Sequence, residues 1–522
     1  MLSRILGMLR DMAFAYYFGA GAIMDAWVIG FKIPNLARRI FGEGAAASAV
    51  IPVYSAELEK NKDNAAVLAR TFATVVFVLL CGIVLLAQAV ILWYVIAVAE
   101  LADTKLMLNL TAIMLPYMAM VCLVAVLGGV LNAHHHFAVP AFAPVILNVC
   151  ILAGLWVAGG LLKIDPQKQA YITAVFVLAA GVLQLLSQFM VLRGYGVSLR
   201  PAWKVKTEPF RNVLTLMGPM ILGMVATQIN TLVNDIIAKA LSGSPARGLT
   251  FEIFGQTLRY PVWEGAVSSL FYAQRLYQFP LGVLGISLAT AIFPMMTRAQ
   301  ARQDNNLLLT TIGRGLKGSI FVAVPATVGL WLVGQPLIAL LFERGRFSSS
   351  DTLLTNRILA FYAIGLTGFF LQQILTRAFY SRLDSRLPAQ TAGFAVVVNI
   401  ILNFAFIWPM GAAGLALSTS LCSYIQVCIL LVVLLGRLGP GFLTGLGKNA
   451  AKTVAATAAM ALVGWLILFF LKNLGRGRAA ELIRLAAVLG GCSITFPAVS
   501  ALLKNEMLGL LLKKAPPDGS QG

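Results

Sequence analysis

Eight charged residues fall within two apolar stretches near the start of the chain, where charge is costly. An ionised side chain at the centre of a bilayer costs roughly 2.5 to 3.5 kcal/mol on insertion scales. Such residues therefore need ion-pair partners, a bound ligand or a water-filled cavity. The eight residues are Arg4, Arg10, Asp11, Asp25, Lys32, Arg38, Arg39 and Glu43.

The spacing of these residues predicts a polar stripe on each helix. At about 100° per residue, Arg4 and Asp11 share one helix face, and Lys32, Arg39 and Glu43 share another. One interpretation is purely structural: Asp11 neutralises Arg4 or Arg10, and Glu43 neutralises Arg39 four residues earlier. The other interpretation is a cavity that receives a ligand.

The balance of charge favours an anionic ligand in such a cavity. Arginine and lysine outnumber the acids in the cluster, and Arg275 adds a cation in a later apolar stretch. Arginine grips phosphate oxygens through two parallel hydrogen bonds, and a pyrophosphate rewards several such contacts at once. We therefore expect a phosphate-bearing substrate rather than a simple cation.

Composition shows that the surrounding solvent is lipid. Of 522 residues, 59% are hydrophobic and 11% charged, whereas a soluble protein carries roughly a quarter of its residues as charged ones. The net charge of +20 does not predict nucleic-acid binding, because most basic residues lie between apolar runs. All six cysteines lie inside apolar runs without CxxC spacing, so neither a disulfide framework nor a zinc site is expected.

The apolar runs predict an all-α polytopic membrane protein with about fourteen transmembrane helices. The loops that would face the cytoplasm carry the larger share of the basic residues if both termini are cytoplasmic, so we expect that orientation. The expected spans are residues 2–18, 25–54, 71–97, 106–131, 137–161, 170–192, 213–241, 267–293, 316–342, 355–379, 389–407, 412–435, 453–471 and 483–503.

The longest basic connection divides this series into two lobes. We expect an N-terminal lobe over 1–192, a basic cytoplasmic linker over 193–212, a C-terminal lobe over 213–436, and an appended helix pair with a cytoplasmic tail over 437–522. Two six-helix lobes related by pseudo-symmetry are typical of alternating-access transporters, whose substrate site lies between the repeats.

Four segments closely resemble the MurJ/MviN lipid II flippases of the MOP exporter superfamily. They are the opening SRILGMLRDMAFAYYFGAGAIMDAWVIGFKIPNLARRIFGEGAAASAVIPVY, FYAQRLYQFPLGVLGISLATAIFP at 271–294, LFERGRFSSSDT at 341–352 and FYSRLDSRLP at 379–388. The resemblance implies fourteen helices and outward movement of undecaprenyl-pyrophosphoryl-MurNAc-pentapeptide-GlcNAc, driven by membrane potential. It also implies the bacterial inner membrane, with lipid II and membrane lipids as partners and the peptidoglycan synthesis machinery as a candidate partner.

The same resemblance assigns roles to the charged residues. By motif, the SR pair, the RD pair, the RR pair and the Y-A-x-R-L arginine bind the substrate diphosphate. Asp11 and Asp25 orient these arginines and form gating contacts, and we place Glu43 with them. The arginines are Arg4, Arg10, Arg38, Arg39 and Arg275.

No cofactor is required, but some members of the family hold a sodium ion in the C-terminal lobe. Asn399 and Asn403 stand four residues apart, and Asp235 and Thr419 would complete an oxygen cage. Asp235 is the least secure of these, because Lys239 one turn later is an alternative partner.

Two features set this chain apart from the family pattern. Residues 242–270 are longer than the family's outer connection and predict a periplasmic flap or a short interfacial helix beside Arg275. Gln274 and Gln278 flank Arg275 where relatives carry acids. The alternatives left open are a flippase for another polyprenyl-diphosphate-linked oligosaccharide, a multidrug antiporter, a membrane enzyme, for which no metal or nucleophile motif is found, and a scaffold without transport.

Overall fold

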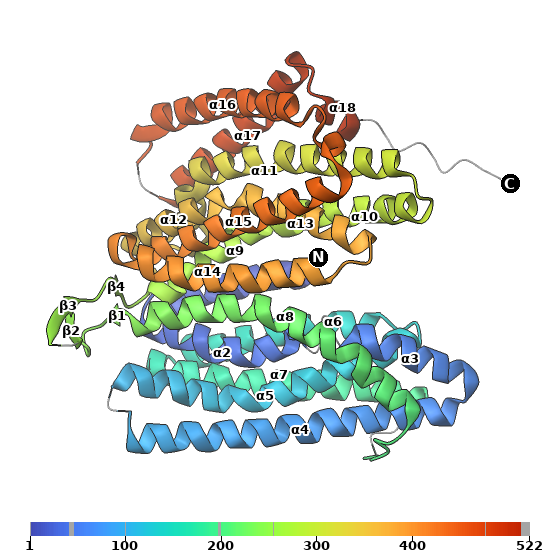
Figure 1. The fold of residues 1–522 in the computed structure, drawn as a ribbon. Helices are drawn as coiled ribbons and strands as arrows, with labels where there is room; N and C mark the ends of the chain where they lie inside the picture. The colour runs from blue at the N-terminus through green and yellow to red at the C-terminus, as the bar shows by residue number, and fades with distance from the viewer. Residues whose placement is uncertain are drawn as a thin grey trace. The chain divides into compact units, whose positions relative to one another are not determined.

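The computed structural model describes residues 2–40, 46–99, 101–196, 200–253, 255–475 and 477–512. Nearly all of them are helical (Figure 1). The first helices are α1 (Leu2–Phe18), α2 (Ala22–Ile40), α3 (Ala46–Lys60), α4 (Lys62–Ala97), α5 (Ala102–Ala133), α6 (Ala138–Leu155), the π-helix η2 (Trp156–Leu161), α7 (Pro166–Gly194) and α8 (Glu208–Ala240).

The later helices continue the same pattern to the end of the described chain. They are α9 (Ala266–Pro280), the π-helix η3 (Leu281–Gly285), α10 (Ile286–Ala301), α11 (Asn305–Phe342), α12 (Ser349–Ile364), α13 (Leu366–Ser381), α14 (Arg386–Met410), α15 (Ala412–Leu438), η4 (Pro440–Leu443), α16 (Leu446–Phe470), η5 (Leu471–Asn473), α17 (Arg478–Leu502) and α18 (Glu506–Leu512).

The predicted all-α membrane fold is confirmed. Within the described ranges, 11 helical stretches are long and apolar enough to cross a membrane. The remaining three predicted spans correspond to α1, α2 and α8. Of these, α1 has 17 residues, and α2 carries four charged residues: Asp25, Lys32, Arg38 and Arg39.

The predicted span over 25–54 contains most of α2, which ends at Ile40, and the first part of α3, which begins at Ala46. The intervening residues 41–45 lie outside the described residues.

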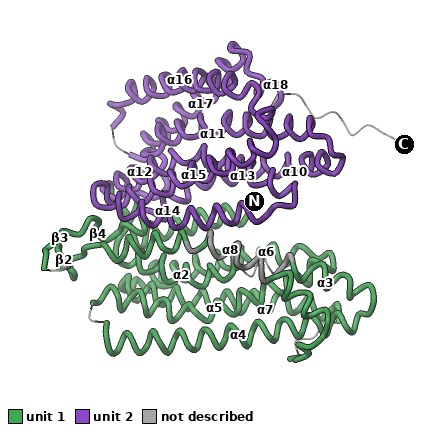
Figure 2. Tube along the Cα trace, in the orientation of Figure 1, with its two compact units in different colours: residues 1–268, 344–348 green, residues 269–343, 349–522 purple. Residues whose placement is uncertain are grey.

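The chain forms two compact units, coloured separately in Figure 2: residues 1–268 with 344–348, and residues 269–343 with 349–522. In the first unit α5 packs against α2, α4 and α7, α6 packs against α7 and α1, and α8 contacts α2 and α3. The predicted lobes at 1–192 and 213–436 are defined by repeats rather than by compactness, so they stay a prediction.

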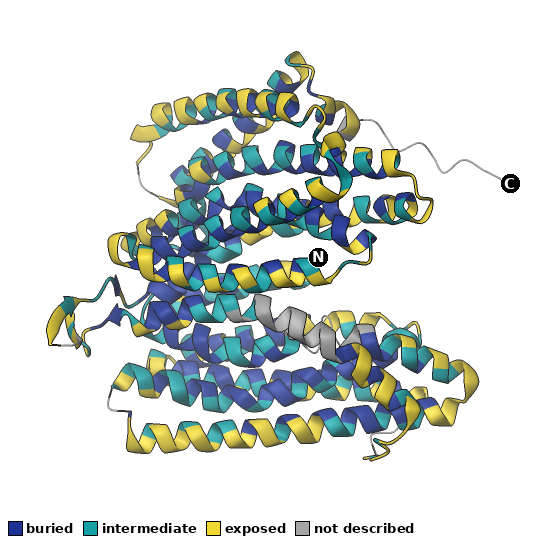
Figure 3. Cartoon of the chain, viewed as in Figure 1, coloured by how far each residue is buried: buried dark blue, intermediate teal, exposed yellow. Residues whose placement is uncertain are grey.

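Lipid-facing surface is evident along α4, much of which is exposed in Figure 3. Leu85, Leu86 and Ile96 are among its exposed apolar side chains, whereas Phe72 and Leu80 are buried. Apolar side chains that face outward on a chain of this hydropathy are expected against lipid tails.

The long connection after α8 forms strands rather than the short helix named as one alternative. β1 (Ser242–Gly243) pairs in parallel with β4 (Val262–Trp263), and β2 (Thr250–Ile253) pairs antiparallel with β3 (Gln256–Arg259). Gly255 in the β2–β3 turn has a φ of +75°, which glycine adopts without strain. The segment is thus a β-structured flap within the first unit.

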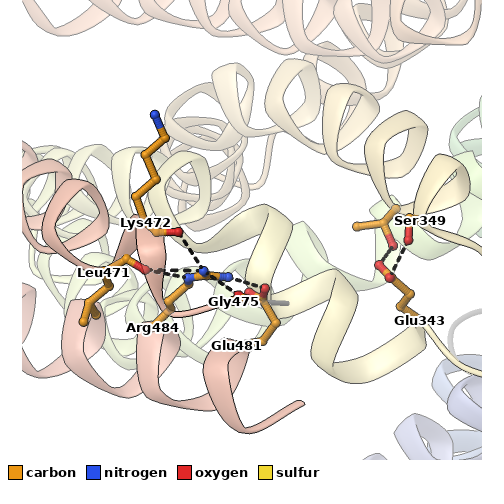
Figure 4. A network of polar contacts seen from close by, with 8 residues as sticks. Glu343, Ser349, Leu471, Lys472, Gly475, Glu481 and Arg484 are labelled. Carbon is orange, nitrogen blue, oxygen red and sulfur yellow. Dashed lines mark hydrogen bonds and ion pairs between the residues drawn. The ribbon is translucent and has the colours of Figure 1, made fainter. Parts of the chain in front are cut away.

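The second unit has one apolar core around α10, α11, α13 and α15 and another where α16 and α17 pack on α11. Polar side chains fix its turns, as Figure 4 shows. Arg484 of α17 donates to the carbonyl oxygens of Leu471, Lys472 and Gly475 and pairs with Glu481 at 2.5 Å. Glu343 accepts from the hydroxyl of Ser349 at 2.7 Å, which joins the end of α11 to α12.

Candidate functional site

Arg10 on α1 is held by an acid and an amide in the first unit. Its Nε and Nη2 donate to Asp11 Oδ1 at 3.0 and 2.7 Å, and its Nη1 donates to Asn148 Oδ1 on α6 at 3.0 Å. Asp11 is buried, and the Arg10 side chain is 12% exposed. The contact with Asp11 agrees with the structural interpretation, in which Asp11 neutralises Arg10. The same hydrogen bonds also orient the guanidinium, as a ligand site would require.

Asn148 is a residue that the sequence reasoning missed. Besides accepting from Arg10, its Nδ2 donates to the Ser3 carbonyl oxygen at 3.3 Å, so it ties α6 to α1 in two places. The signal that the sequence offered for Asn148 is a single asparagine in an apolar span. The structure shows that this asparagine is buried. Arg4, one residue after Ser3, is exposed.

The end of α1 is closed by part of the motif at 341–352. The Arg346 N–H donates to the Tyr16 carbonyl oxygen at 3.0 Å, and Arg346 belongs to the same compact unit as α1. Gly345 has a φ of +60°, and a Cβ there would lie 2.2 Å from the Tyr16 carbonyl oxygen. The motif therefore requires glycine at this close approach.

Asp25 on α2 is fully buried and caps the first turn of α9. Its carboxylate accepts from the Gly265 N–H at 2.8 Å, the Ser268 N–H at 2.8 Å and the Ser268 hydroxyl at 2.7 Å. A carboxylate at a helix N-terminus is stabilised by the unpaired N–H groups there. These contacts lie within the first unit, and its predicted roles in orienting arginines and in gating stay predictions.

Two buried ion pairs connect α8 to other helices of the first unit. Lys32 of α2 donates to Asp235 and, at 3.0 Å, to the Thr231 carbonyl oxygen. Lys239 lies 3.7 Å from Asp103 at the start of α5. Asp235 is thus paired with Lys32. Lys239, which the sequence analysis gave as an alternative partner of Asp235, pairs with Asp103 instead.

Two further cations of α2 are Arg38 and Arg39. Arg38 is half-buried, and its Nε donates to Asn35 Oδ1 at 2.8 Å one turn earlier. Glu43 and the side chain of Arg39 lie outside the described residues, and so does their predicted ion pair.

Arg275 lies on α9 in the second unit. Its guanidinium carbon is 4.6 Å from the centre of the Phe271 ring, which is a cation–π contact. Neighbouring Gln274 donates to the Tyr362 hydroxyl at 3.0 Å. A neutral amide thus occupies the position beside Arg275.

The four residues named for sodium fall into two groups. Asn399 and Asn403 are buried on α14, with the Asn403 Nδ2 donating to Asn399 Oδ1 at 3.0 Å, and Thr419 donates to the Leu415 carbonyl oxygen on α15. Asp235 belongs to the first unit and pairs with Lys32. In the described structure Asn399 Oδ1 accepts from Asn403, and sodium binding stays a prediction.

Glu264 adds an acid to the segment between α8 and α9 in the first unit. Burial raises the pKa of its carboxyl above the ordinary value, and the negative charges of Asp103 and Asp25 raise it further, whereas Lys239 lowers it. Acids and a lysine therefore share this region with the first turn of α9.

Comparison with known proteins agrees with the predicted family and fold. The family model described as "Lipid II flippase MurJ" matches residues 14–482. The "Probable lipid II flippase MurJ" of Vibrio cholerae is 32% identical over 480 residues, covering 89% of this chain and 85% of that protein. The corresponding protein of Rhizobium meliloti is 33% identical, with 88% and 83% covered.

Solved structures share the fold. A structure titled "Lipid II flippase MurJ, inward closed conformation" aligns with a TM-score of 0.73 at 24% identity, covering 98% of both chains. An inward-facing multidrug resistance MATE family transporter of the MOP superfamily aligns with a TM-score of 0.62 at 14% identity, covering 85% of this chain and 96% of that one.

The expected family is therefore confirmed by sequence over most of the chain, and the polytopic fold agrees with it. The predicted arginines lie on α1, α2 and α9, and their role in binding substrate stays a prediction. This chain belongs to the MurJ lipid II flippase family.

Proposed function

We propose that this chain carries lipid II, undecaprenyl-pyrophosphoryl-MurNAc-pentapeptide-GlcNAc, from the cytoplasmic to the periplasmic leaflet for peptidoglycan synthesis. The observation that carries the proposal is the family match over 14–482 in a chain whose helices α1, α2 and α9 hold the predicted arginines. The relatives are named for lipid II, and no observation favours another polyprenyl-diphosphate-linked oligosaccharide.

In this proposal the arginines bind the diphosphate. Arg10, Arg38 and Arg275 present planar guanidinium groups, each able to make paired hydrogen bonds to phosphate oxygens. Arg4 and Arg39 extend the positive charge on the same helices. A net positive site in a low-dielectric surrounding attracts an anion of two or more charges strongly.

Asp11 has the geometry of a competitor for Arg10. Two of the three Arg10 hydrogen bonds end on Asp11 Oδ1, so a diphosphate must take over that edge of the guanidinium. An ion pair that breaks on substrate entry and reforms on release would return the empty site to its starting state. Asp25, whose partners are backbone and hydroxyl groups, would hold the first turn of α9 in place meanwhile.

Membrane potential supplies a driving force for such a site. Moving one charge through the whole field is worth about 2.3 kcal/mol per 100 mV. A net positive site that has released its anion outside is drawn back inward by an inside-negative potential. The chain would act in the bacterial inner membrane with both termini in the cytoplasm, as the basic loops favour.

Complementation of flippase-depleted cells tests this function. We expect the unmodified chain to restore growth and Arg10→Ala and Arg38→Ala to fail while the proteins still accumulate in the membrane. Arg259→Ala is the matched control, because Arg259 is an exposed residue of β3 outside the predicted site. Growth with both site variants would refute the diphosphate-binding role, and failure of the unmodified chain would refute the function.

Arg275→Lys separates phosphate binding from charge alone. The lysine ammonium keeps the charge but cannot reproduce the planar fork of two donors. We expect most of the transport to be lost in Arg275→Lys and more in Arg275→Glu. Near-normal flipping by Arg275→Lys would make Arg275 a membrane anchor.

A further inference from the structure

A cavity of about 570 Å³ lies within the second unit, away from the residues named for lipid II or sodium. It is enclosed by the first half of α11, η4 with the turn that follows it, and α18. Small-molecule sites typically span about 300 to 1,000 Å³, so the cavity can hold a substantial chemical group. Its lining includes the apolar Leu309, Phe442 and Leu510 and the charged Arg314, Lys317 and Glu506.

The two cations of the cavity lie on the same face of α11, three residues apart. Arg314 is exposed and makes no hydrogen bond or ion pair with any other residue that the structure describes. Lys317 Nζ is 3.3 Å from Glu506 Oε2, but the Glu506 side chain is 68% exposed. The Lys317 side chain is 15% exposed, so it is the exposed Glu506 carboxylate that can move away into solvent, and a ligand with more negative charge than one carboxylate can replace it.

The start of α16 adds to the positive character of this site. Its N-cap, Gly445, provides no side chain to accept from the first N–H groups of the helix. A Cβ placed on Gly445 would lie 3.1 Å from Lys317 Nζ, so the ammonium sits directly beside this helix end. The N-terminus of a helix carries roughly half a positive charge and favours anions.

The wall formed by α18 is anchored by buried amides. Asn449 of α16 donates to Asn505 Oδ1 at 2.8 Å, and Asn505 donates to the Thr453 hydroxyl at 3.1 Å. The Met507 N–H of α18 donates to Asn505 Oδ1 at 3.1 Å. All three polar side chains are buried. The cavity is therefore built between fixed helices rather than left by a loose terminal segment.

From this arrangement we propose that the cavity binds the phosphate group of an anionic phospholipid of the cytoplasmic leaflet. Arg314 and Lys317 take the phosphate, and Leu309, Phe442 and Leu510 contact the glycerol and the first acyl carbons. The apolar lining and the exposed Leu510 favour a lipid over a soluble phosphate. The site goes beyond the proposed transport, because this lipid is bound and not moved.

The test is phospholipid binding to the full chain, measured by native mass spectrometry in detergent without lipid II. Phosphatidylglycerol is titrated into the unmodified chain and four variants, with phosphatidylcholine as the neutral lipid. We expect Arg314→Ala and Lys317→Ala each to weaken phosphatidylglycerol binding about tenfold, the loss typical of a charged hydrogen bond. Glu506→Gln should tighten it about threefold, since the competing carboxylate is removed.

The fourth variant, Lys472→Ala, carries the same loss of charge at an exposed position at the far end of α16, and its affinity should not change. An equal loss in Lys472→Ala would mean general surface attraction and overturn the site. Unchanged or weaker binding by Glu506→Gln would also overturn it, and a misfolded protein cannot mimic the expected gain. Displacement of phosphatidylglycerol by millimolar inorganic phosphate would overturn the choice of a lipid. Because no lipid II is present, the outcome does not depend on whether the chain flips it.

Discussion

The pair of Lys32 and Asp235 allows a quantitative test of how the charged helices are held together. Removing one partner of a buried pair typically costs about 3–5 kcal/mol, because the other charge is left without compensation. The Lys32 side chain is 21% exposed and that of Asp235 is 3% exposed. Lys32 therefore has more freedom to move to a new partner after Asp235→Asn than Asp235 has after Lys32→Met.

This asymmetry fixes the expected order of the variants. We expect Asp235→Asn to lower the free energy of unfolding by about 3 kcal/mol and Lys32→Met to lower it by about 4 kcal/mol. The double variant Lys32→Met with Asp235→Leu should recover about 2 kcal/mol or more of the summed loss, since no buried charge is left unpaired. A coupling energy of about 2 kcal/mol or more is then expected for residues in contact.

The free energies can be measured by equilibrium unfolding of the purified protein in mixed micelles of increasing SDS content. Losses below about 0.5 kcal/mol in both single variants would refute the pair as a buried contact. A double variant as unstable as the sum of the two would show that the residues act independently. Flipping by the double variant shows whether the pair has a role in transport. Retained transport means that the pair is structural, and lost transport with recovered stability means that the pair takes part in the transport cycle.

Three further predictions use other parts of the chain. An outer-surface thiol reagent should label Gly255→Cys in the β2–β3 turn and not Val205→Cys in the basic linker, and the reverse pattern would overturn the proposed orientation. The Arg437 guanidinium lies 2.6 Å from the Asp384 carboxylate and holds the pKa of that carboxyl below its ordinary value. The pair therefore stabilises the folded protein at pH values above the pKa that Asp384 has in the unfolded state. This stabilisation is lost as the pH falls through the pKa that Asp384 has in the folded state. Asp384→Asn should thus be less stable than the unmodified chain at neutral pH with the gap closing in acid, and a gap independent of pH would contradict this. Asn403→Ala should weaken any sodium-dependent rise in melting temperature, and melting that does not respond to sodium in the unmodified chain would remove the sodium proposal.

The sequence predicted the membrane fold well because the cost of burying polar backbone in lipid leaves a long apolar helix as the main solution. Each predicted span has a helical counterpart in the described structure, with 25–54 divided between α2 and α3. Contacts between residues that are close in sequence could also be predicted. Arg10 and Asp11 are adjacent in sequence, and their contact was one of the two readings.

Contacts between distant helices were not predictable from one sequence. Asp235 pairs with Lys32 rather than with Lys239 one turn away, although Lys32 lies 203 positions earlier. Asp25 finds its partners at Gly265 and Ser268. Spacing along a helix shows which residues share a face, but the opposing helix is set by packing, which periodicity does not encode. The strands after α8 were not predicted, because strands of two to four residues are too short to show an alternation of apolar and polar residues.

The central claim is that this chain moves lipid II through binding of its diphosphate by arginines. The most direct measurement is flipping by the purified chain in proteoliposomes that carry labelled lipid II on one leaflet, with an inside-negative potential imposed. The account predicts that labelled lipid II becomes accessible on the opposite leaflet with the unmodified chain and with Arg259→Ala, and remains inaccessible with Arg10→Ala or Arg38→Ala. Equal rates in protein-free liposomes and in liposomes holding the unmodified chain would contradict the claim.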